Sequence, residues 1–422
     1  MSVFVVPRLD GPVQRTVNVP GSKSLANRAL VIAGLVGDVV VSNVPNGDDT
    51  VAMCDALVLL GADVTWDDST VRVGRPIDRS RRNSVTVDAR LAGTTSRFLV
   101  ALAALIDGET TVTGEDALRR RPMDELVLAL RSLGARVSST DGSNRLPLTI
   151  ARAGCDGGQV ALSGEVSSQF ISALMMVAPR LRGGLSIELS GELVSASYVG
   201  LTSHVMSHFG VDPLVTGGEI TIPEGAYEPR DFVVAPDASS ASYPLALVAL
   251  HGGSVCVPGL AHSQDQGDFR ILDYLRAAGC DARVTGDDVV IERDPSRELR
   301  AVDVDMRDSS DLVPTMAIVA AVARGVSRIR GVGFIRTKES DRIGDLAREM
   351  RVLGCDVVEE SDGLSITGGA LHGGTLSTHH DHRLAMAFGL IGTLVEGVTL
   401  DDESVVSKSW PSYWTDMGIT RI

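Results

Sequence analysis

The chain has 422 residues, of which 44% are hydrophobic and 4% aromatic, and its formal net charge is −15 at pH 7. This length predicts two domains or one long repeat array, with cores built from aliphatic side chains. The acidic balance argues against nucleic acid as a partner. The five scattered cysteines lack C-x-x-C spacing, which argues against disulfides and zinc, and the apolar runs are interrupted by charge, which argues against membrane association. We therefore expect a cytoplasmic protein with reduced thiols.

One pattern recurs six times: an apolar, alanine-rich run, a turn, and a short β-branched run. A helix-like stretch that closes on a glycine alternates with it, and these glycines lie roughly 70 residues apart, which suits a supersecondary repeat. Each repeat therefore predicts strand, apolar helix, strand, amphipathic helix, strand, in an α/β protein of like modules. The copies are Ala26–Val44, Ser96–Thr113, Phe170–Leu189, Ser242–Val257, Thr315–Val332 and Arg383–Leu400, and the closing glycines are Gly61, Gly134, Gly210, Gly279, Gly354 and Gly418.

Two places look like crossings between domains, at residues 19–21 and 235–237. Three repeats lie between them and three follow. We therefore expect one domain over residues 20–236 and a second, similar domain from residues 1–19 plus 237–422.

A polar cluster precedes each apolar run, and the sharpest is Pro20–Arg28, with the sequence PGSKSLANR. Lys23 and Ser24 are expected at a helix start, with Arg28 one turn later. A lysine, hydroxyl groups and free backbone N–H groups at a helix start form a site for anions. The alternative is a capped helix with solvated charges.

The next clusters in the N-terminal half carry weaker signals. Gly93 and Arg97 lie at the start of the second apolar helix, where a glycine permits close backbone approach. Taken alone, this motif indicates an ordinary C-cap or turn glycine. Arg121 ends a cationic loop run that Pro122 would orient by fixing the following helix start, and the alternative is a solvated run. Ser167, Ser168 and Gln169 offer hydroxyls and an amide at the third helix start, although the two serines also read as ordinary N-caps.

In the C-terminal half, Asp311 precedes the fifth apolar run, and Lys338 and Arg342 are expected on one face of a helix at i and i+4. A surface ion-pair lattice is the alternative for that pair. His380–Arg383 (HDHR) precedes the sixth helix, but adjacent side chains diverge and no third ligand set is evident, so we expect no metal. Lys408 lies near the C-terminus.

Together these cations form a positive set in an acidic chain, mostly at equivalent helix starts. If the helix starts of both halves face one another, the cleft between the domains binds two anionic small molecules, with Asp311 and Glu339 as proton-transfer groups. The set comprises Lys23, Arg28, Arg97, Arg121, Lys338, Arg342, Arg383 and Lys408.

With these motifs the chain resembles the 5-enolpyruvylshikimate-3-phosphate (EPSP) synthase family over nearly its whole length. The shared motifs keep the family's order: PGSKSLANRAL, LAGTTSRF, RRRPM, SSQF, LVSASY, DASSASY, SSDLVPT, TKESDR, DHRLAM and SKSWP. The resemblance implies two similar domains of three βαβαββ-like units, each an inside-out α/β barrel, with the active site in the cleft between them. It implies transfer of enolpyruvyl from phosphoenolpyruvate to the 5-hydroxyl of shikimate 3-phosphate, without metal or cofactor. We expect a monomer.

The resemblance also assigns roles to individual residues. Asp311 resembles the base that takes the 5-hydroxyl proton, and Glu339 with Lys23 resembles the group that protonates the methylene carbon. Contacts to shikimate 3-phosphate are implied for Lys23, Ser24, Arg28, Ser167, Ser168, Gln169, Ser195, Tyr198, Asp311 and Lys338. Contacts to phosphoenolpyruvate are implied for Lys23, Gly93, Arg121, Gln169, Arg342, Arg383 and Lys408.

The chain departs from the family pattern at three positions. Leu91 and Phe334 stand where many members have asparagine, and Phe98 stands where many have proline. Gly93, beside which the herbicide glyphosate lies in this family, is retained. We therefore expect glyphosate to inhibit the protein.

Three other functions fit parts of this pattern. UDP-N-acetylglucosamine enolpyruvyl transferases share the fold, but they carry a cysteine where this chain has Asp116, and they lack a TKESDR-type segment. RNA-end cyclases use a related repeat, but the acidic balance and the absence of a nucleotide-transfer histidine motif argue against that chemistry. A non-catalytic anion-binding relative would not need Asp311 and Glu339 in a phosphate cleft.

Overall fold

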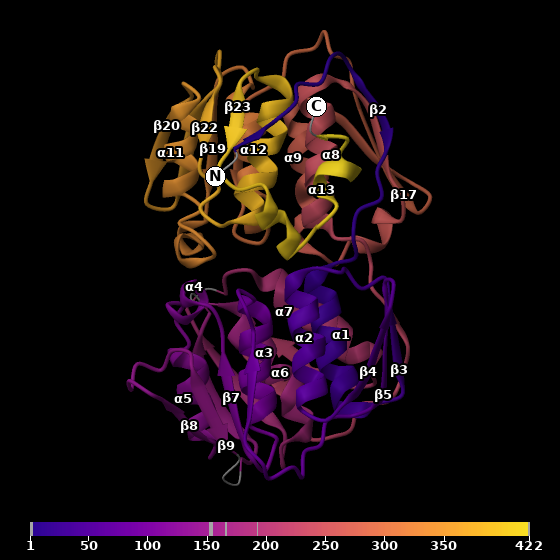
Figure 1. Ribbon diagram of the computed structural model, residues 1–422, viewed down its shortest axis with the longest axis vertical. Helices are drawn as coiled ribbons and strands as arrows, with labels where there is room; N and C mark the ends of the chain where they lie inside the picture. The colour runs from indigo at the N-terminus through magenta and orange to yellow at the C-terminus, as the bar shows by residue number, and fades with distance from the viewer. Residues whose placement is uncertain (1–2, 152–154, 165–166, 192, 421–422) are drawn as a thin grey trace. The chain divides into compact units, whose positions relative to one another are not determined.

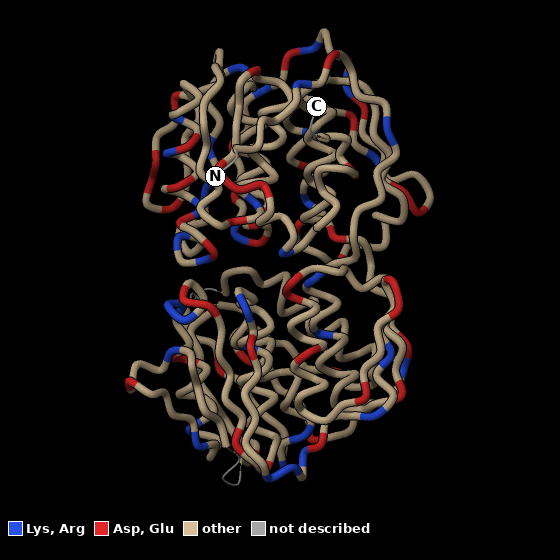
Figure 2. The backbone as a smooth tube through the Cα atoms, viewed as in Figure 1, with Lys and Arg blue, Asp and Glu red and all other residues tan. Residues whose placement is uncertain are grey.

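The computed structural model describes residues 3–151, 155–164, 167–191 and 193–420 (Figure 1). The chain forms two units, which we call the N-lobe (Gly21–Val234) and the C-lobe (Met1–Pro20 with Ala235–Ile422). The polypeptide therefore passes between the lobes twice, at Pro20–Gly21 and at Val234–Ala235. In both lobes, charged residues of either sign are interspersed mainly over strands and loops (Figure 2).

Within its described residues, the N-lobe contains three four-stranded sheets of one topology. Their strands are β3 (Val39–Ser42), β4 (Asp63–Asp67), β5 (Thr70–Arg75), β6 (Val85–Asp88), β7 (Glu109–Thr113), β8 (Arg136–Ser139), β9 (Leu148–Ala151), β10 (Gly158–Ser163), β11 (Leu185–Ser190), β12 (Leu214–Thr216), β13 (Glu219–Ile222) and β14 (Phe232–Val233). Each sheet starts with a parallel pair, β14–β3, β6–β7 or β10–β11, and ends in an antiparallel hairpin. Since β14 comes from the end of the lobe, the first sheet closes only when the chain returns.

The described part of the C-lobe repeats this topology twice and then varies it. Its strands are β1 (Phe4–Val5), β2 (Val13–Thr16), β15 (Gly253–Val257), β16 (Asp281–Thr285), β17 (Asp288–Arg293), β18 (Asp303–Asp305), β19 (Val326–Arg330), β20 (Asp356–Glu360), β21 (Gly363–Thr367), β22 (Gly374–Leu376) and β23 (Val398–Leu400). The parallel pairs are β2–β15, β18–β19 and β22–β23. In the third sheet β1 pairs antiparallel with β23, in place of a hairpin. The N-terminal residues thus contribute strands to two sheets of this lobe.

The apolar helices begin at the predicted polar clusters and lie at the centre of each lobe, between the sheets (Figure 1). In the N-lobe they are α1 (Lys23–Val36), α3 (Gly93–Ala103) and α6 (Ser168–Val177), and in the C-lobe α8 (Ala238–His251), α10 (Val313–Ala321) and α12 (His382–Leu394). Every residue of α8 is buried. The predicted modular α/β fold is confirmed, because each apolar run forms a helix followed by a strand.

The second helix of each repeat ends at the glycine that the sequence predicts. These helices are α2 (Asp48–Leu59), α5 (Asp124–Ser132), α7 (Ala196–His208), α9 (Ile271–Ala278), α11 (Gly344–Val352) and α13 (Tyr413–Asp416). The closing glycines have φ between +62° at Gly418 and +107° at Gly279. A left-handed residue after a helix satisfies its last carbonyls, and glycine adopts this conformation without steric cost. No helix in the described ranges is long and apolar enough to cross a bilayer.

We expect Gly392→Ala in α12 to destabilise the protein. A Cβ at Gly392 meets Val6 Cβ at 2.6 Å, and overpacking a buried contact typically costs about 1–3 kcal/mol. Gly200→Ala in α7 is the control, since a Cβ there meets nothing within 4 Å. That change should add up to about 1 kcal/mol of helix stability. Urea unfolding measures both, and an equal effect of the two changes contradicts the packing argument.

Candidate functional site

In the N-lobe, Lys23 is the first residue of α1 and pairs with a buried carboxylate. Its Nζ lies 2.9 Å from Oδ2 of Asp49, whose side chain is 3% exposed. Asp49 lies in the first turn of α2, where an acid suits the helix dipole. The ammonium group is therefore held at the start of α1 by the neighbouring helix.

Arg28, one turn into α1, lies buried among neutral oxygens. Its Nε donates to Thr202 Oγ1 (2.8 Å), its Nη2 to Ser172 Oγ (3.0 Å) and the Tyr198 carbonyl (3.3 Å), and its Nη1 to the Ser24 carbonyl (2.8 Å). None of these four acceptors is charged. The site therefore fixes the guanidinium through α1, α6 and α7 without using up its charge.

Two aromatic rings complete the surroundings of Arg28. Its Cζ lies 5.3 Å from the ring centroid of Phe98 and 5.9 Å from that of Tyr198, within the range of a cation–π contact. Burial lowers the pKa of Arg28 to about 10. The group still carries its charge at neutral pH.

Gly93, the first residue of α3, is enclosed by two guanidinium groups. Arg97 Nη1 donates to the Gly93 carbonyl at 2.8 Å. A Cβ at Gly93 would lie 2.7 Å from Arg97 Nη1 and still closer to the guanidinium of Arg121. The missing side chain therefore allows both cations to approach the backbone at this helix start.

The remaining N-lobe candidates lie at the starts of α6 and α7. Ser167 is the N-cap of α6, and its hydroxyl accepts from the Gln169 backbone N–H at 3.3 Å. Gln169 Nε2 donates to Thr94 Oγ1 at 3.1 Å, which links α6 to the start of α3. Ser168 and Ser195 are buried, and Ser195 is the N-cap of α7, which carries Tyr198.

In the C-lobe, the carboxylate of Asp311 accepts hydrogen bonds from three cationic side chains. Its Oδ1 accepts from Lys338 Nζ at 2.7 Å and Arg342 Nη1 at 2.8 Å, and its Oδ2 accepts from Arg383 Nη2 at 2.7 Å. Burial by itself would raise the pKa of Asp311, but Arg383, Lys338 and Arg342 outweigh burial and hold the pKa well below its usual range. Asp311 is therefore ionised at neutral pH.

The cluster extends from Arg342 to two further carboxylates. Arg342 binds Asp381 through Nε (2.7 Å) and Nη2 (3.2 Å), and Nη2 also donates to Glu339 Oε2 at 2.8 Å. Lys408 Nζ reaches Glu339 Oε1 at 3.1 Å. Three carboxylates and four cations, Lys338, Arg342, Arg383 and Lys408, thus form one network, which we call the Asp311 cluster.

The expected helical face for Lys338 and Arg342 is wrong. The preceding 3₁₀ turn ends at Thr337 and α11 begins only at Gly344, so neither cation lies on a helix. Oδ1 of Asp341 accepts from the backbone N–H groups of Ile343 (3.2 Å) and Gly344 (3.0 Å) and so starts α11 at that point. Lys338 and Arg342 meet through Asp311 instead.

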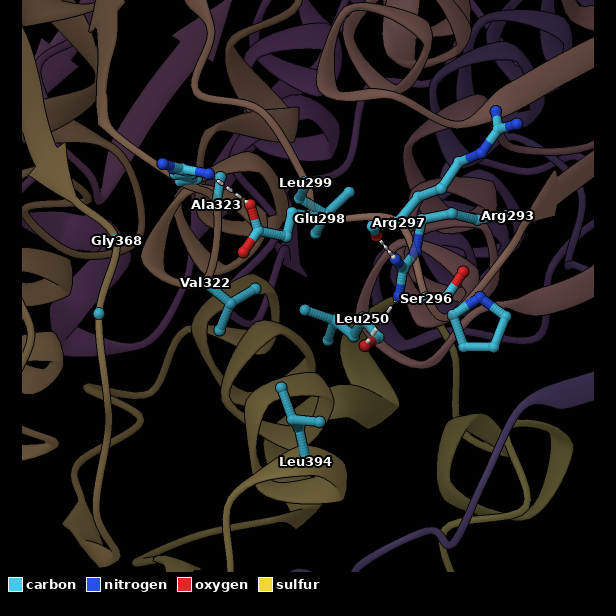
Figure 3. Close-up of a pocket in the computed structure, with 13 residues that line it drawn as sticks. Leu250, Arg293, Ser296, Arg297, Glu298, Leu299, Val322, Ala323, Gly368 and Leu394 are labelled. Atoms are coloured by element: carbon cyan, nitrogen blue, oxygen red, sulfur yellow. Dashed lines mark hydrogen bonds and ion pairs between the residues drawn. The ribbon is translucent and has the colours of Figure 1, made fainter.

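The described residues contain no cluster of metal ligands, and one pocket of the C-lobe lies apart from the predicted site residues. Among the described residues, no group of three or more His, Cys, Asp or Glu side chains is arranged to hold a metal ion. A pocket of about 360 Å³ lies in the C-lobe. Leu250, Val322 and Leu394 are among its lining residues (Figure 3). No predicted site residue lines it. Two of its lining residues, Glu298 and Arg324, form an ion pair at 3.0 Å.

Comparisons with known proteins agree on one family. The family model for EPSP synthase (3-phosphoshikimate 1-carboxyvinyltransferase) matches residues 8–417. The 3-phosphoshikimate 1-carboxyvinyltransferase of Syntrophobacter fumaroxidans is 40% identical over 95% of this chain and 96% of its own length. The chain belongs to the EPSP synthase family. The enzyme of the same name from Nostoc punctiforme is 37% identical, and 98% of each chain is covered.

Solved structures show the same fold. An EPSP synthase from Acinetobacter baumannii superposes with a TM-score of 0.79 at 23% identity, over 99% of this chain and 97% of that one. A second structure of an EPSP synthase from that organism gives 0.78 at 22% identity. The predicted family and α/β fold are confirmed.

Some residues of the site were not predicted from the sequence. Asp49 and Asp381 hold Lys23 and Arg342, and Thr202 with Ser172 holds Arg28. Asp381 is the N-cap of α12 and lies within the HDHR motif, so an acid before a helix was a signal for it. Ser172 lies inside the apolar helix α6 and Thr202 inside α7, where the sequence gives no such signal.

We expect Asp381→Ala to cost about 3–5 kcal/mol of unfolding free energy. Breaking a buried ion pair leaves Arg342 without its bidentate partner, and the substitution also removes a helix cap. Glu298→Gln is the control, because its pair with Arg324 is 70% and 82% exposed and such pairs contribute at most about 1 kcal/mol. Chemical denaturation monitored by circular dichroism compares the two. A loss for Asp381→Ala no larger than the control's contradicts the assigned role.

Proposed function

We propose that the protein transfers the enolpyruvyl group of phosphoenolpyruvate to the 5-hydroxyl of shikimate 3-phosphate and releases phosphate, as a 3-phosphoshikimate 1-carboxyvinyltransferase. The reaction serves chorismate and aromatic amino-acid biosynthesis in the shikimate pathway. The observation that carries the proposal is the Asp311 cluster. In this cluster ion pairs with four cationic side chains fix the positions of two carboxylates, Asp311 and Glu339. The chain that carries it belongs to the EPSP synthase family.

The N-lobe residues are proposed to bind shikimate 3-phosphate. Arg28 supplies a charge fixed by neutral oxygens, and Ser24, Ser167 and Ser168 supply hydroxyl groups or backbone N–H groups at helix starts. Hydroxyls and amides suit a polyol, and helix starts suit a phosphate. Gln169, Ser195 and Tyr198 complete this set, with Lys338 and Asp311 from the C-lobe.

The cations of both lobes are proposed to bind phosphoenolpyruvate. Arg342, Arg383 and Lys408 come from the C-lobe, whereas Lys23, Arg121, Gln169 and the space at Gly93 come from the N-lobe. The proposal requires both lobes to act on the same pair of substrates. Cations that already lie in place stabilise charge as it moves onto the leaving phosphate.

Asp311 is proposed to accept the proton of the 5-hydroxyl of shikimate 3-phosphate as the hydroxyl oxygen attacks C2 of phosphoenolpyruvate. With three cations on it, Asp311 is a weak base. A bound phosphate shares Arg383 and Arg342, which weakens their hold and raises the pKa of Asp311 toward a useful range.

Glu339, with Lys23, is proposed to deliver a proton to C3 as the C2–O bond forms. The tetrahedral adduct then loses a proton from the new methyl group as the C2–O bond to phosphate breaks. This restores the enol ether and releases phosphate. We further propose that the protein acts in the cytoplasm as a monomer, without metal or cofactor.

The decisive assay mixes the purified protein with both substrates and measures phosphate release. We expect release with shikimate 3-phosphate and none with UDP-N-acetylglucosamine. Asp311→Asn should lower kcat by about 10²–10⁴-fold, the usual contribution of a general base, while Glu298→Gln leaves it unchanged. Release with UDP-N-acetylglucosamine alone assigns the sister activity. Anion binding without any turnover assigns a non-catalytic relative.

Inhibition by glyphosate tests the space at Gly93. We expect inhibition of the wild type, and at least about a tenfold higher half-inhibitory concentration for Gly93→Ala, equivalent to about 1.4 kcal/mol. The added methyl group must displace the guanidinium groups of Arg121 and Arg97. Gly200→Ala is the matched control. Turnover of the wild type that millimolar glyphosate does not change overturns the prediction.

A further inference from the structure

A fourth carboxylate of the C-lobe is buried near the Asp311 cluster, and the mechanism above does not use it. Asp268 lies in a 3₁₀ turn (Gly267–Arg270) and is 4% exposed. This turn packs against the 3₁₀ turn that carries Asp311 and against α8. Oδ2 of Asp268 accepts from the hydroxyl of Ser239, at the start of α8.

The surroundings of Asp268 do not require a carboxylate for stability. The start of α8 is already capped by Asp237, which accepts from the Ser239 backbone N–H at 2.9 Å, and by Gln266, which accepts from the Ala238 N–H at 3.0 Å. Oδ1 of Asp268 is buried and has no hydrogen-bond partner among the described residues. A buried carboxylate used only for packing would be expected to have both oxygens satisfied.

The charges that act on Asp268 belong to the proposed catalytic cluster. The negative charge of Asp311 opposes its ionisation and the positive charge of Arg383 favours it, and Asp268 acts in turn on Arg383. The other charged or titratable groups near it are Asp237, Arg270 and Tyr274. Besides burial, Arg383 is influenced most by Asp311, which it contacts, then by Tyr243 and Asp237, and after these by Asp268.

We propose that Asp268 is a positioning residue whose protonation sets how much of the positive charge of Arg383 is available to Asp311 and to an anionic substrate. This inference rests on the proposed function for its catalytic consequence, but not for the titration itself. When Asp268 is protonated, the charge of Arg383 serves Asp311 and the substrate. When Asp268 is ionised, it competes for that charge.

The expected pH range follows from the environment. Burial raises the pKa of Asp268 to about 7, with Asp311 adding to the rise, while Arg383 and the hydroxyl of Ser239 oppose it. A phosphate bound at Arg383 adds negative charge nearby, so Asp268 takes a proton from solvent on binding and returns it on phosphate release. Proton uptake and release thus balance over one turnover.

The test compares kcat/KM for phosphoenolpyruvate in wild type and Asp268→Asn, from about pH 5.5 to about 8.5, around the pKa of about 7. The amide stays neutral at every pH, so the two proteins should agree at the acidic end. At the alkaline end kcat/KM of the variant should exceed that of the wild type at least about threefold, through a lower KM. The variant lacks the negative charge of ionised Asp268, which in the wild type opposes anion binding. Titration of the substrates themselves is common to both proteins and cancels in the ratio.

Two further variants distinguish titration from a structural role. Ser239→Ala removes the hydroxyl that favours the ionised form of Asp268, so the pKa of Asp268 should rise. The pH at which kcat/KM departs from that of Asp268→Asn should therefore be higher in Ser239→Ala than in wild type. Asp273→Asn, an exposed carboxylate on α9, should leave the profile unchanged. A ratio of variant to wild type that is constant across the pH range overturns the proposal, whether or not Asp268→Asn lowers stability.

Infrared difference spectra between the acidic and alkaline ends of this range need no substrate. A protonated-carboxyl band that wild type loses with rising pH, and that Asp268→Asn lacks from the start, supports the inference even if no phosphate is released. Absence of that band in the wild type overturns it even if the enzyme is active. Failure of the proposed function and failure of this inference are therefore distinguishable.

Discussion

In the C-lobe one largely buried carboxylate, with a side chain only 14% exposed, joins three separate chain segments. Asp311 joins its own 3₁₀ turn to the segment of Lys338 and Arg342 and to the start of α12 at Arg383. Removing these groups from water is costly, and only mutual pairing offsets that cost. With Glu339 and Asp381 the network counts three negative and four positive groups, which leaves one net positive charge. A network of this kind holds its shape without ligand and still favours an anion.

The N-lobe presents charge in a different way. Arg28 is held by carbonyl and hydroxyl oxygens of Ser24, Ser172, Tyr198 and Thr202, so its position is fixed while its charge stays available. Lys23, by contrast, already pairs with Asp49. An anion that approaches Lys23 must compete with a carboxylate, whereas one that approaches Arg28 competes only with neutral dipoles. This difference favours Arg28 as the stronger of the two proposed anion contacts.

The elements that could be predicted from the sequence are those with local causes. Helix ends at Gly61 or Gly279 follow from the left-handed backbone that a helix end requires, and the start of α6 at Ser168 follows from the Ser167 cap beside an apolar run. Contacts between distant residues were not predictable from spacing, since the pairing of Lys23 with Asp49 or of Arg342 with Asp381 arises only when the repeats pack. The segment from Lys338 to Arg342 shows the limit, because the 3₁₀ turn ends at Thr337 and Asp341 binds the first N–H groups of α11 only after Arg342, so the apparent helical spacing is not realised.

The repeat explains why supporting groups lie where they do. Each apolar helix needs a polar start to satisfy its first N–H groups, and packing brings several such starts together within a lobe. In the C-lobe, α10 and α12 place Asp311 and Arg383 at their starts, while α8 places Asp237 and Ser239 beside Asp268. Once capping is satisfied by one residue at a start, a second polar residue there is released from that structural task. Asp268 takes this position at the start of α8, where its neighbours Asp237 and Gln266 already bind the backbone, and its charge can therefore act on Arg383.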